Sequence, residues 1–189
     1  MANTELLSTL LEKRGIKGEA QIEIFLNPDY IRDLHDPFLM KDMERACVRL
    51  FEVVDAGEKI VIYADYDCDG IPGAVILNDL FKKINYANYE VYIPQRNSEG
   101  YGLNMEAIKQ FRDSGVKLLI TIDLGITAVA EVAQAEVDGM DVIITDHHLP
   151  RQSTSDGGVV SLDLPRAYAI LNPKTDSYPE KMLCGAGVM

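Results

Sequence analysis

Residues 59–70 read KIVIYADYDCDG. The first half is a run of β-branched and aromatic residues, which predicts a buried strand over residues 60–65. The second half places Asp65, Asp67 and Asp69 at alternate positions, beginning where that strand ends. In open parallel sheets, ligands bind beyond the carboxyl ends of the strands. The stretch therefore predicts both a core strand and a functional edge.

The same pattern recurs along the chain. Further strands are predicted over residues 89–94, 117–123, 141–146 and 168–171. Amphipathic stretches predict helices over residues 71–84, 105–114 and 128–137, with Asn104 and Thr127 as N-caps of the last two. Strands rich in Val, Ile and Leu that alternate with helices predict an α/β fold, a parallel sheet with helices on both faces. Residues 151–164 lack this pattern and are expected to be a linker.

Residues 1–58 are predicted to be a helical region. Leu6, Leu7, Leu10 and Leu11 form one apolar stripe, and a second runs over residues 38–54. We therefore divide the chain into an N-terminal helical region, residues 1–58, and an α/β domain, residues 59–189.

The composition, with 47% hydrophobic and 25% charged residues among 189, is that of a globular protein. The net charge of −12 argues against a broad basic surface for nucleic acid. No apolar run reaches the length of a membrane span and no signal peptide is evident, so we expect a cytoplasmic protein without membrane contact. Three cysteines are too few for a disulfide framework.

Three of the predicted strands end in acidic residues. The first runs into Asp65, the third ends at Asp123, and the fourth ends at Asp146, which His147 and His148 follow. These ends converge if the first, third and fourth strands are neighbours, which predicts the strand order 2-1-3-4. Carboxylates crowded at one edge repel each other unless divalent cations bind between them. Carboxylates with imidazole suit Mn²⁺, and a two-metal site predicts phosphoester hydrolysis.

The tandem histidines are expected to differ in role. Successive side chains on extended backbone point in opposite directions, so both are not expected to be equivalent ligands of one ion. We expect His147 to bind a metal, His148 to contact the scissile phosphate or the second metal, and Asp146 to support them. For Asp123, a surface carboxylate at a strand end is the alternative.

Other interpretations of residues 65–70 remain open. An EF-hand loop begins similarly, but it needs a Glu where this chain has Ile76 and a helix before it. A haloacid-dehalogenase-type aspartyl nucleophile also follows a first strand. Turn-forming and helix-capping residues explain Asp69 with Gly70, but not all three aspartates. Cys68 alternates away from its acidic neighbours and is expected to be a small buried residue.

The segment RNSEGYGL, residues 96–103, follows the second predicted strand. It can place Arg96 on a phosphate and Tyr101 against a base or sugar. A plain glycine-rich loop explains the segment almost as well.

Three motifs, DYDCDG at residues 65–70, TIDLGI at 121–126 and DHHLP at 146–150, resemble the first three motifs of the DHH phosphoesterase family in order and context. The segments LHDPFL, RNSEGYGLN and GAGV, at residues 34–39, 96–104 and 185–188, are similar to its RecJ branch, exonucleases specific for single-stranded DNA. The resemblance covers nearly the whole chain. Two positions depart from the pattern of relatives: Tyr63 stands where some have His, and Leu124 where many have a polar residue.

The resemblance implies a set of site residues. The implied metal ligands are Asp67, Asp69, Asp123 and His147, and Asp65 and His148 complete the site as catalytic residues. It also implies Mn²⁺ or Mg²⁺ as cofactors and 5′ to 3′ hydrolysis of single-stranded DNA in repair and recombination. A single-strand-binding protein and a repair helicase are the implied partners.

The family's fourth motif and its C-terminal substrate-binding domain are not found in residues 1–189. We therefore expect a truncated DHH catalytic domain at residues 59–189 and weak or no activity from these residues alone. The alternatives are a DHH phosphodiesterase for short oligonucleotides or cyclic dinucleotides, and an inactive DNA-replication accessory protein. The last would have lost the ligands that this sequence retains.

Overall fold

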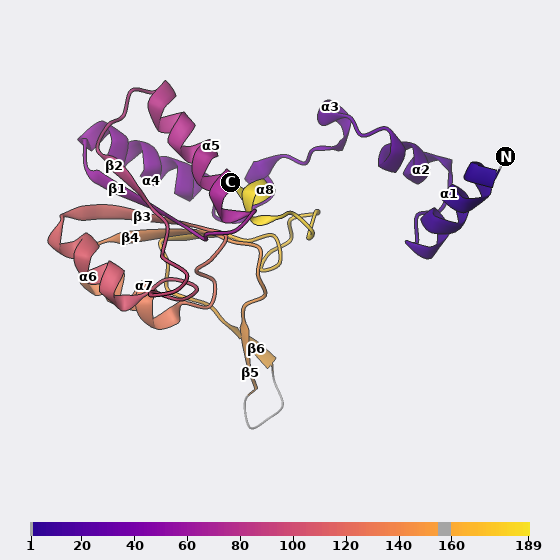
Figure 1. Ribbon diagram of the computed structural model, residues 1–189. Helices are drawn as coiled ribbons and strands as arrows, with labels where there is room; N and C mark the ends of the chain where they lie inside the picture. The colour runs from indigo at the N-terminus through magenta and orange to yellow at the C-terminus, as the bar shows by residue number, and fades with distance from the viewer. Residues whose placement is uncertain (1, 155–159) are drawn as a thin grey trace. The chain divides into compact units, whose positions relative to one another are not determined.

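A five-stranded parallel sheet with the order β2-β1-β3-β4-β7 organises the larger part of the chain (Figure 1). The computed structural model describes residues 2–154 and 160–189. The strands are β1 (Lys59–Ala64), β2 (Tyr89–Tyr92), β3 (Val116–Ile122), β4 (Asp141–Thr145) and β7 (Ala169–Leu171). The predicted strands and the order 2-1-3-4 are confirmed, and β7 extends the sheet beside β4.

Helices cover both faces of this sheet, as predicted. They are α4 (Met43–Ala56), α5 (Gly70–Lys83), α6 (Met105–Asp113), α7 (Val129–Val137) and the short α8 (Gly185–Val188). Figure 1 shows α4, α5 and α8 on one face and α6 and α7 on the other. The alternation of β1 explains the two cores, because Ile60 and Ile62 pack with α4 and α5 while Val61 and Tyr63 pack with α6 and α7.

The helix ends agree with the sequence at one cap and differ at another. Asn104 caps α6, because its side chain accepts a hydrogen bond from the Ala107 amide at 2.8 Å. The prediction that Thr127 caps α7 is wrong. The residue before α7 is Ala128, whose amide donates to the Gly125 carbonyl at 2.9 Å, so Thr127 lies within a turn and Ala128 takes the N-cap position.

The expected linker at residues 151–164 contains a hairpin instead. β5 (Arg151–Thr154) pairs in an antiparallel manner with β6 (Val160–Asp163), and both strands are exposed. Neither strand buries a face, so no hydrophobic alternation marks them in the sequence. Residues 155–159 of the expected linker lie outside the described residues.

The chain divides into two compact units, residues 1–36 and residues 37–189. The first contains α1 (Ala2–Lys13), α2 (Glu19–Leu26) and α3 (Tyr30–Asp33), where Asp29 caps α3 by accepting hydrogen bonds from the Ile31 and Arg32 amides. No helix in the described part of the chain is long and apolar enough to cross a membrane.

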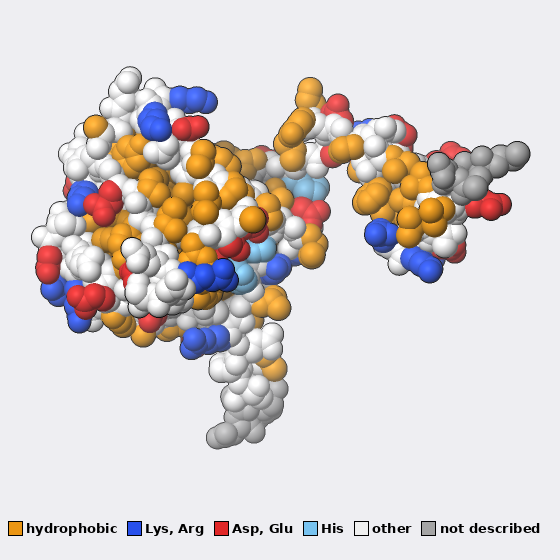
Figure 2. Space-filling view, viewed as in Figure 1, with side chains coloured by type: hydrophobic (Ala, Val, Ile, Leu, Met, Phe, Trp, Pro, Cys, Tyr) orange, Lys and Arg blue, Asp and Glu red, His pale blue; other side chains and the backbone are white. Residues whose placement is uncertain are grey.

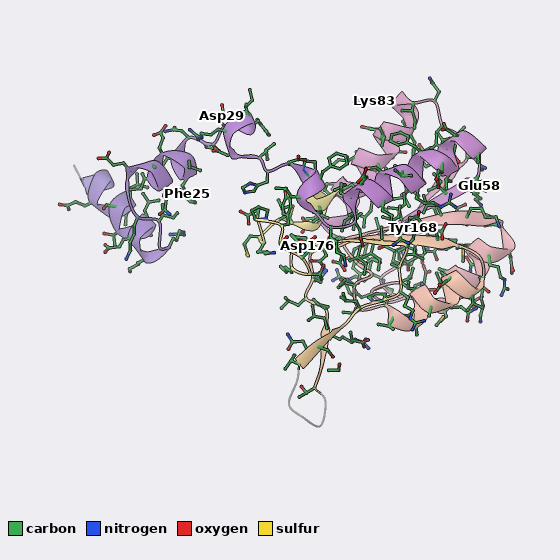
Figure 3. The ribbon with its side chains drawn as sticks, turned by 180° about the vertical axis from the view of Figure 1, so that it is seen from behind. Phe25, Asp29, Glu58, Lys83, Tyr168 and Asp176 are labelled. Atoms are coloured by element: carbon green, nitrogen blue, oxygen red, sulfur yellow. The ribbon has the colours of Figure 1, made fainter. Side chains whose placement is uncertain are left out.

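The segment that begins the second unit, with the turn η1 (Pro37–Leu39) and α4, packs against the sheet domain. Arg49 of α4 bonds to Asp141 of β4 at 2.6 Å, and Arg45 lies 4.2 Å from the centre of the Tyr168 ring. The Lys41 amide donates to Asp176 at 3.1 Å; Figure 3 labels Tyr168 and Asp176. A functional boundary after residue 58 stays a prediction.

Candidate metal centre

Three buried aspartates lie side by side where β1, β3 and β4 end. The parallel ladder continues through them: the Asp65 amide donates to the Ile122 carbonyl at 3.1 Å, and the Asp123 amide donates to the Thr145 carbonyl at 2.9 Å. Asp65, Asp123 and Asp146 are each no more than 3% exposed. The sheet register therefore brings three carboxyl groups to one edge, as the acidic strand ends predicted.

Asp123 is the most perturbed of these residues. Its backbone has a φ of 62°, in the left-handed region that residues other than glycine rarely adopt. Its Oδ1 atom is buried without a hydrogen-bond donor. Burial, followed by the charge of Asp67, raises the pKa of Asp123 to about 7. A buried carboxylate oxygen without a donor is costly unless a cation binds it, so Asp123 fits a metal ligand.

The loop after β1 presents two more carboxylates. Asp67 Oδ1 accepts hydrogen bonds from the amides of Asp69 and Gly70 at 2.8 and 3.0 Å, which hold the pKa of Asp67 below its usual range. Asp69 Oδ2 accepts from the Gly185 amide at 3.1 Å. Residue 185 must be glycine, because a Cβ there would lie 2.2 Å from Asp123 Oδ1.

The Asp67 turn also overturns one expectation. The loop is not extended, so successive side chains do not alternate in direction along it. The predicted burial of Cys68 is therefore wrong, because Cys68 is exposed.

Each histidine is oriented by a different partner. His147 Nδ1 lies 3.0 Å from the Leu183 carbonyl, which can only accept, so Nδ1 is the donor, and in the neutral ring Nε2 holds the lone pair. That Nε2 lies 3.2 Å from Asp123 Oδ1 and 3.7 Å from Asp69 Oδ2. An unprotonated nitrogen that faces carboxylates is the arrangement a cation binds.

Asp146 orients His148. Its Oδ1 lies 2.7 Å from His148 Nδ1 and accepts from the His147 and His148 amides, while Oδ2 accepts from the Ile126 amide at 2.9 Å. Both oxygens are thus occupied by donors. Asp146 therefore lies outside the groups that can hold an ion, in a position to fix the histidine rings.

Two groups of candidate ligands meet at Asp123. Within each group, one ligand atom from every residue lies within 4.8 Å of the others. The groups are Asp65, Asp67 and Asp123, and Asp123, His147 and His148. A carboxylate common to two groups suits a pair of divalent cations, which can together activate a water and stabilise a leaving oxygen. Pale-blue histidine and red acidic atoms reach the surface beside one another in Figure 2.

Arg96 and Tyr101 lie beside this cluster. The Arg96 guanidinium stacks 4.9 Å from the centre of the Tyr66 ring, and its charge acts on Asp65. The Tyr101 ring contacts the His148 ring edge-on at 6.3 Å. Burial and then the charges of Asp146 and Asp65 raise the pKa of the Tyr101 phenol. Both side chains can therefore reach a substrate at the cluster.

Tyr63, by contrast, does not face the cluster. It is fully buried in the α6 and α7 core, and its hydroxyl donates to the Gly102 carbonyl at 2.9 Å. The sequence analysis missed the Leu183 carbonyl, because a backbone acceptor leaves no residue signature.

The sequence model of the DHH family, N-terminal domain, matches residues 59–189. The chain belongs to the DHH family. Within that family, it is 40% identical to the single-stranded-DNA-specific exonuclease RecJ of Bacillus subtilis over 187 residues, 98% of this chain and 22% of that protein. It is 30% identical to RecJ of Escherichia coli over 97% of this chain and 30% of that protein.

A solved structure agrees. A crystal structure of exonuclease RecJ bound to manganese matches with a TM-score of 0.69 and 30% identity, over 82% of this chain and 37% of the other. The chain thus spans 22% and 30% of the length of the two RecJ relatives described above. The resemblance to the DHH family and its RecJ branch is confirmed.

Proposed function

We propose that this chain carries the metal-binding part of a 5′ to 3′ exonuclease that hydrolyses phosphodiester bonds in single-stranded DNA. The observation that carries the proposal is the buried, donorless Oδ1 of Asp123, shared by two groups of candidate ligands. The similarity to RecJ exonucleases, including one bound to manganese, supports the metal and the substrate. By the same similarity we propose a cytoplasmic role in DNA repair and recombination, with a single-strand-binding protein and a helicase as partners.

The residues have distinct roles in this proposal. Mn²⁺ or Mg²⁺ would be held by Asp67, Asp69, Asp123 and His147. Bound there, the ions would supply a water of lowered pKa and stabilise charge on the phosphate. Asp65 and His148 line the same space and can exchange a proton with the attacking water or the leaving oxygen.

Three other side chains would position the substrate and the histidines. Asp146 holds the His148 ring through Nδ1, which leaves Nε2 to face the substrate. Arg96 would bind a phosphate through its planar guanidinium, beside the ring of Tyr66. Tyr101 would contact a base or sugar. An inactive accessory protein is disfavoured, because its carboxylates would have no cation to offset their repulsion.

The test is calorimetric titration of residues 1–189 with Mn²⁺, together with hydrolysis of 5′-labelled single-stranded DNA. We expect Mn²⁺ to bind and Asp67→Asn to weaken that binding strongly, with weak hydrolysis at most. Asp163→Asn, at an exposed position on β6, is the matched control and should bind Mn²⁺ normally. If the unaltered chain does not bind Mn²⁺, the proposed function is wrong. Robust Mn²⁺-dependent hydrolysis would contradict the expected weakness of these residues alone.

A further inference from the structure

A small cavity of about 130 Å³ lies at the opposite end of β4 from the metal centre. Asp141, the first residue of β4, lines this cavity, whereas Asp146 follows the last residue of that strand. At about 3.3 Å per residue, the strand separates the two aspartates by about 16 Å. The other walls come from α4, from α7 and from the residues just before β7. The cavity is therefore separate from the candidate metal ligands.

Two arginines line this cavity without an acidic partner. Arg45 of α4 and Arg166, which precedes β7, are both exposed. Among residues 2–154 and 160–189, neither of them makes an ion pair, whereas Arg49 on the same helix as Arg45 pairs with Asp141 and Glu58. The chain has 30 acidic and 18 basic residues, so two unpaired arginines in one cavity are unexpected. Their charge and their hydrogen-bond donors are available to a ligand.

One of these arginines is held in place by an aromatic ring. The Arg45 guanidinium lies over the ring of Tyr168, which Figure 3 labels, at 4.2 Å from the ring centre. Stacking uses the face of a guanidinium and leaves its N–H groups to bind an oxyanion.

The charge and the volume of the cavity restrict the ligand. Glu136 also lines the cavity, and the charge of Asp141 is offset by Arg49 at 2.6 Å. Arg45, Arg166 and Glu136 together leave one positive charge, which matches a singly charged carboxylate better than a doubly charged phosphate. A volume of about 130 Å³ is below the range of cavities that enclose whole organic ligands. The cavity therefore fits one carboxylate group of a larger ligand.

We propose that this cavity binds a carboxylate of an acidic peptide segment in a partner protein. Arg45 and Arg166 donate hydrogen bonds to the carboxylate oxygens, and the rest of the peptide lies on the surface outside the cavity. A nucleic acid strand fits this surface less well, because it would bring many phosphates toward a chain of net charge −12. The site does not depend on the metal chemistry of the proposed function.

The test is an NMR titration of ¹⁵N-labelled residues 1–189 with an acetylated and amidated peptide of alternating Asp and Gly. A matched peptide with Asn in place of Asp removes only the charge. We expect the Asp peptide to shift the amides around Tyr168 and Asp141 and the Asn peptide to leave them unchanged. Inorganic phosphate is the third ligand, and it should bind more weakly than the Asp peptide.

Arginine variants separate the cavity from a general effect of charge. Arg166→Gln and Arg45→Gln should each weaken binding of the Asp peptide by about tenfold or more, since a tenfold change is about 1.4 kcal/mol and a hydrogen bond to a charged group contributes about 1.5–3 kcal/mol. The control Arg151→Gln, at an exposed arginine of β5 outside the cavity, should preserve the affinity.

Three results would overturn the inference. They are an Asp peptide that shifts no amide of the cavity, an Arg151→Gln variant that loses as much affinity as Arg166→Gln, and inorganic phosphate that binds more tightly than the Asp peptide. Mn²⁺ affinity should be the same in the unaltered chain and in all three variants. Loss of peptide binding with Mn²⁺ binding intact would leave the proposed function standing.

Discussion

Asp123→Asn should stabilise the metal-free protein while it removes the response to metal. The pKa of Asp123 is raised from its ordinary value of 3.8 to about 7, first by burial and then by Asp67. Because the folded pKa exceeds the unfolded one, the contribution of Asp123 to stability is complete below about pH 4. It is lost as the pH rises to about 7.

The interval between the two pKa values corresponds to about 4 kcal/mol at most. Asn is neutral at every pH, and its amide can donate to the Asp67 carboxylate that repels Asp123. At pH 8 without metal, the variant should therefore unfold at a higher temperature, by up to about 8–16 °C for a chain of this length. The unaltered protein should lose stability between pH 4 and pH 7, and the variant should keep only the dependence due to Asp65, whose pKa burial also raises.

Thermal unfolding followed by circular dichroism, in EDTA and in Mn²⁺, measures both effects. Mn²⁺ should raise the midpoint of the unaltered protein and leave that of Asp123→Asn nearly unchanged. Asp163→Asn is the control, because this carboxylate is exposed and belongs to neither group of candidate ligands. A variant that is less stable than the unaltered protein at pH 8 in EDTA would refute the argument, since Asp123 would then not be a destabilising charge.

Three further outcomes follow from the same geometry. Gly185→Ala should abolish Mn²⁺ binding, because its Cβ would lie 2.2 Å from Asp123 Oδ1. Gly187→Ala should not, because the atom nearest its Cβ would be Cys184 Sγ at 3.5 Å; calorimetric titration compares the two. Asp146→Asn should change the imidazole NMR signals of His148, whose Nδ1 lies 2.7 Å from Asp146 Oδ1, and unchanged signals would exclude the orienting role. Tyr63→Phe should lower the free energy of unfolding by about 1 kcal/mol in urea, through the hydrogen bond to Gly102, with Mn²⁺ affinity preserved.

The sequence was sufficient for the sheet and for the location of the site. The strand order 2-1-3-4 was predicted by placing the acidic strand ends, such as those at Asp65 and Asp123, on neighbouring strands. Backbone alternation did not describe His147 and His148, because their ring centres lie 4.7 Å apart and both rings offer a ligand atom to the group around Asp123.

Other features of the site depend on tertiary contacts that no local sequence pattern predicts. The left-handed backbone of Asp123 is a property of its turn, and the Leu183 carbonyl that orients His147 is contributed by backbone. The β5–β6 hairpin buries no face, so it has no hydrophobic period. Cys68 was misplaced because alternation was extended into a loop that hydrogen bonds to Asp67 fold into a turn.

Two contacts tie residues 183–185 to the metal centre: the Leu183 carbonyl accepts from His147, and the Gly185 amide donates to Asp69. The side chains that hold residues 183–185, His147 and Asp69, are thus also candidate metal ligands. A cation that binds His147 and Asp69 would therefore also restrain the segment that begins α8. The Gly185 amide is therefore a built-in reporter of occupancy, and its hydrogen exchange should slow as divalent ions bind.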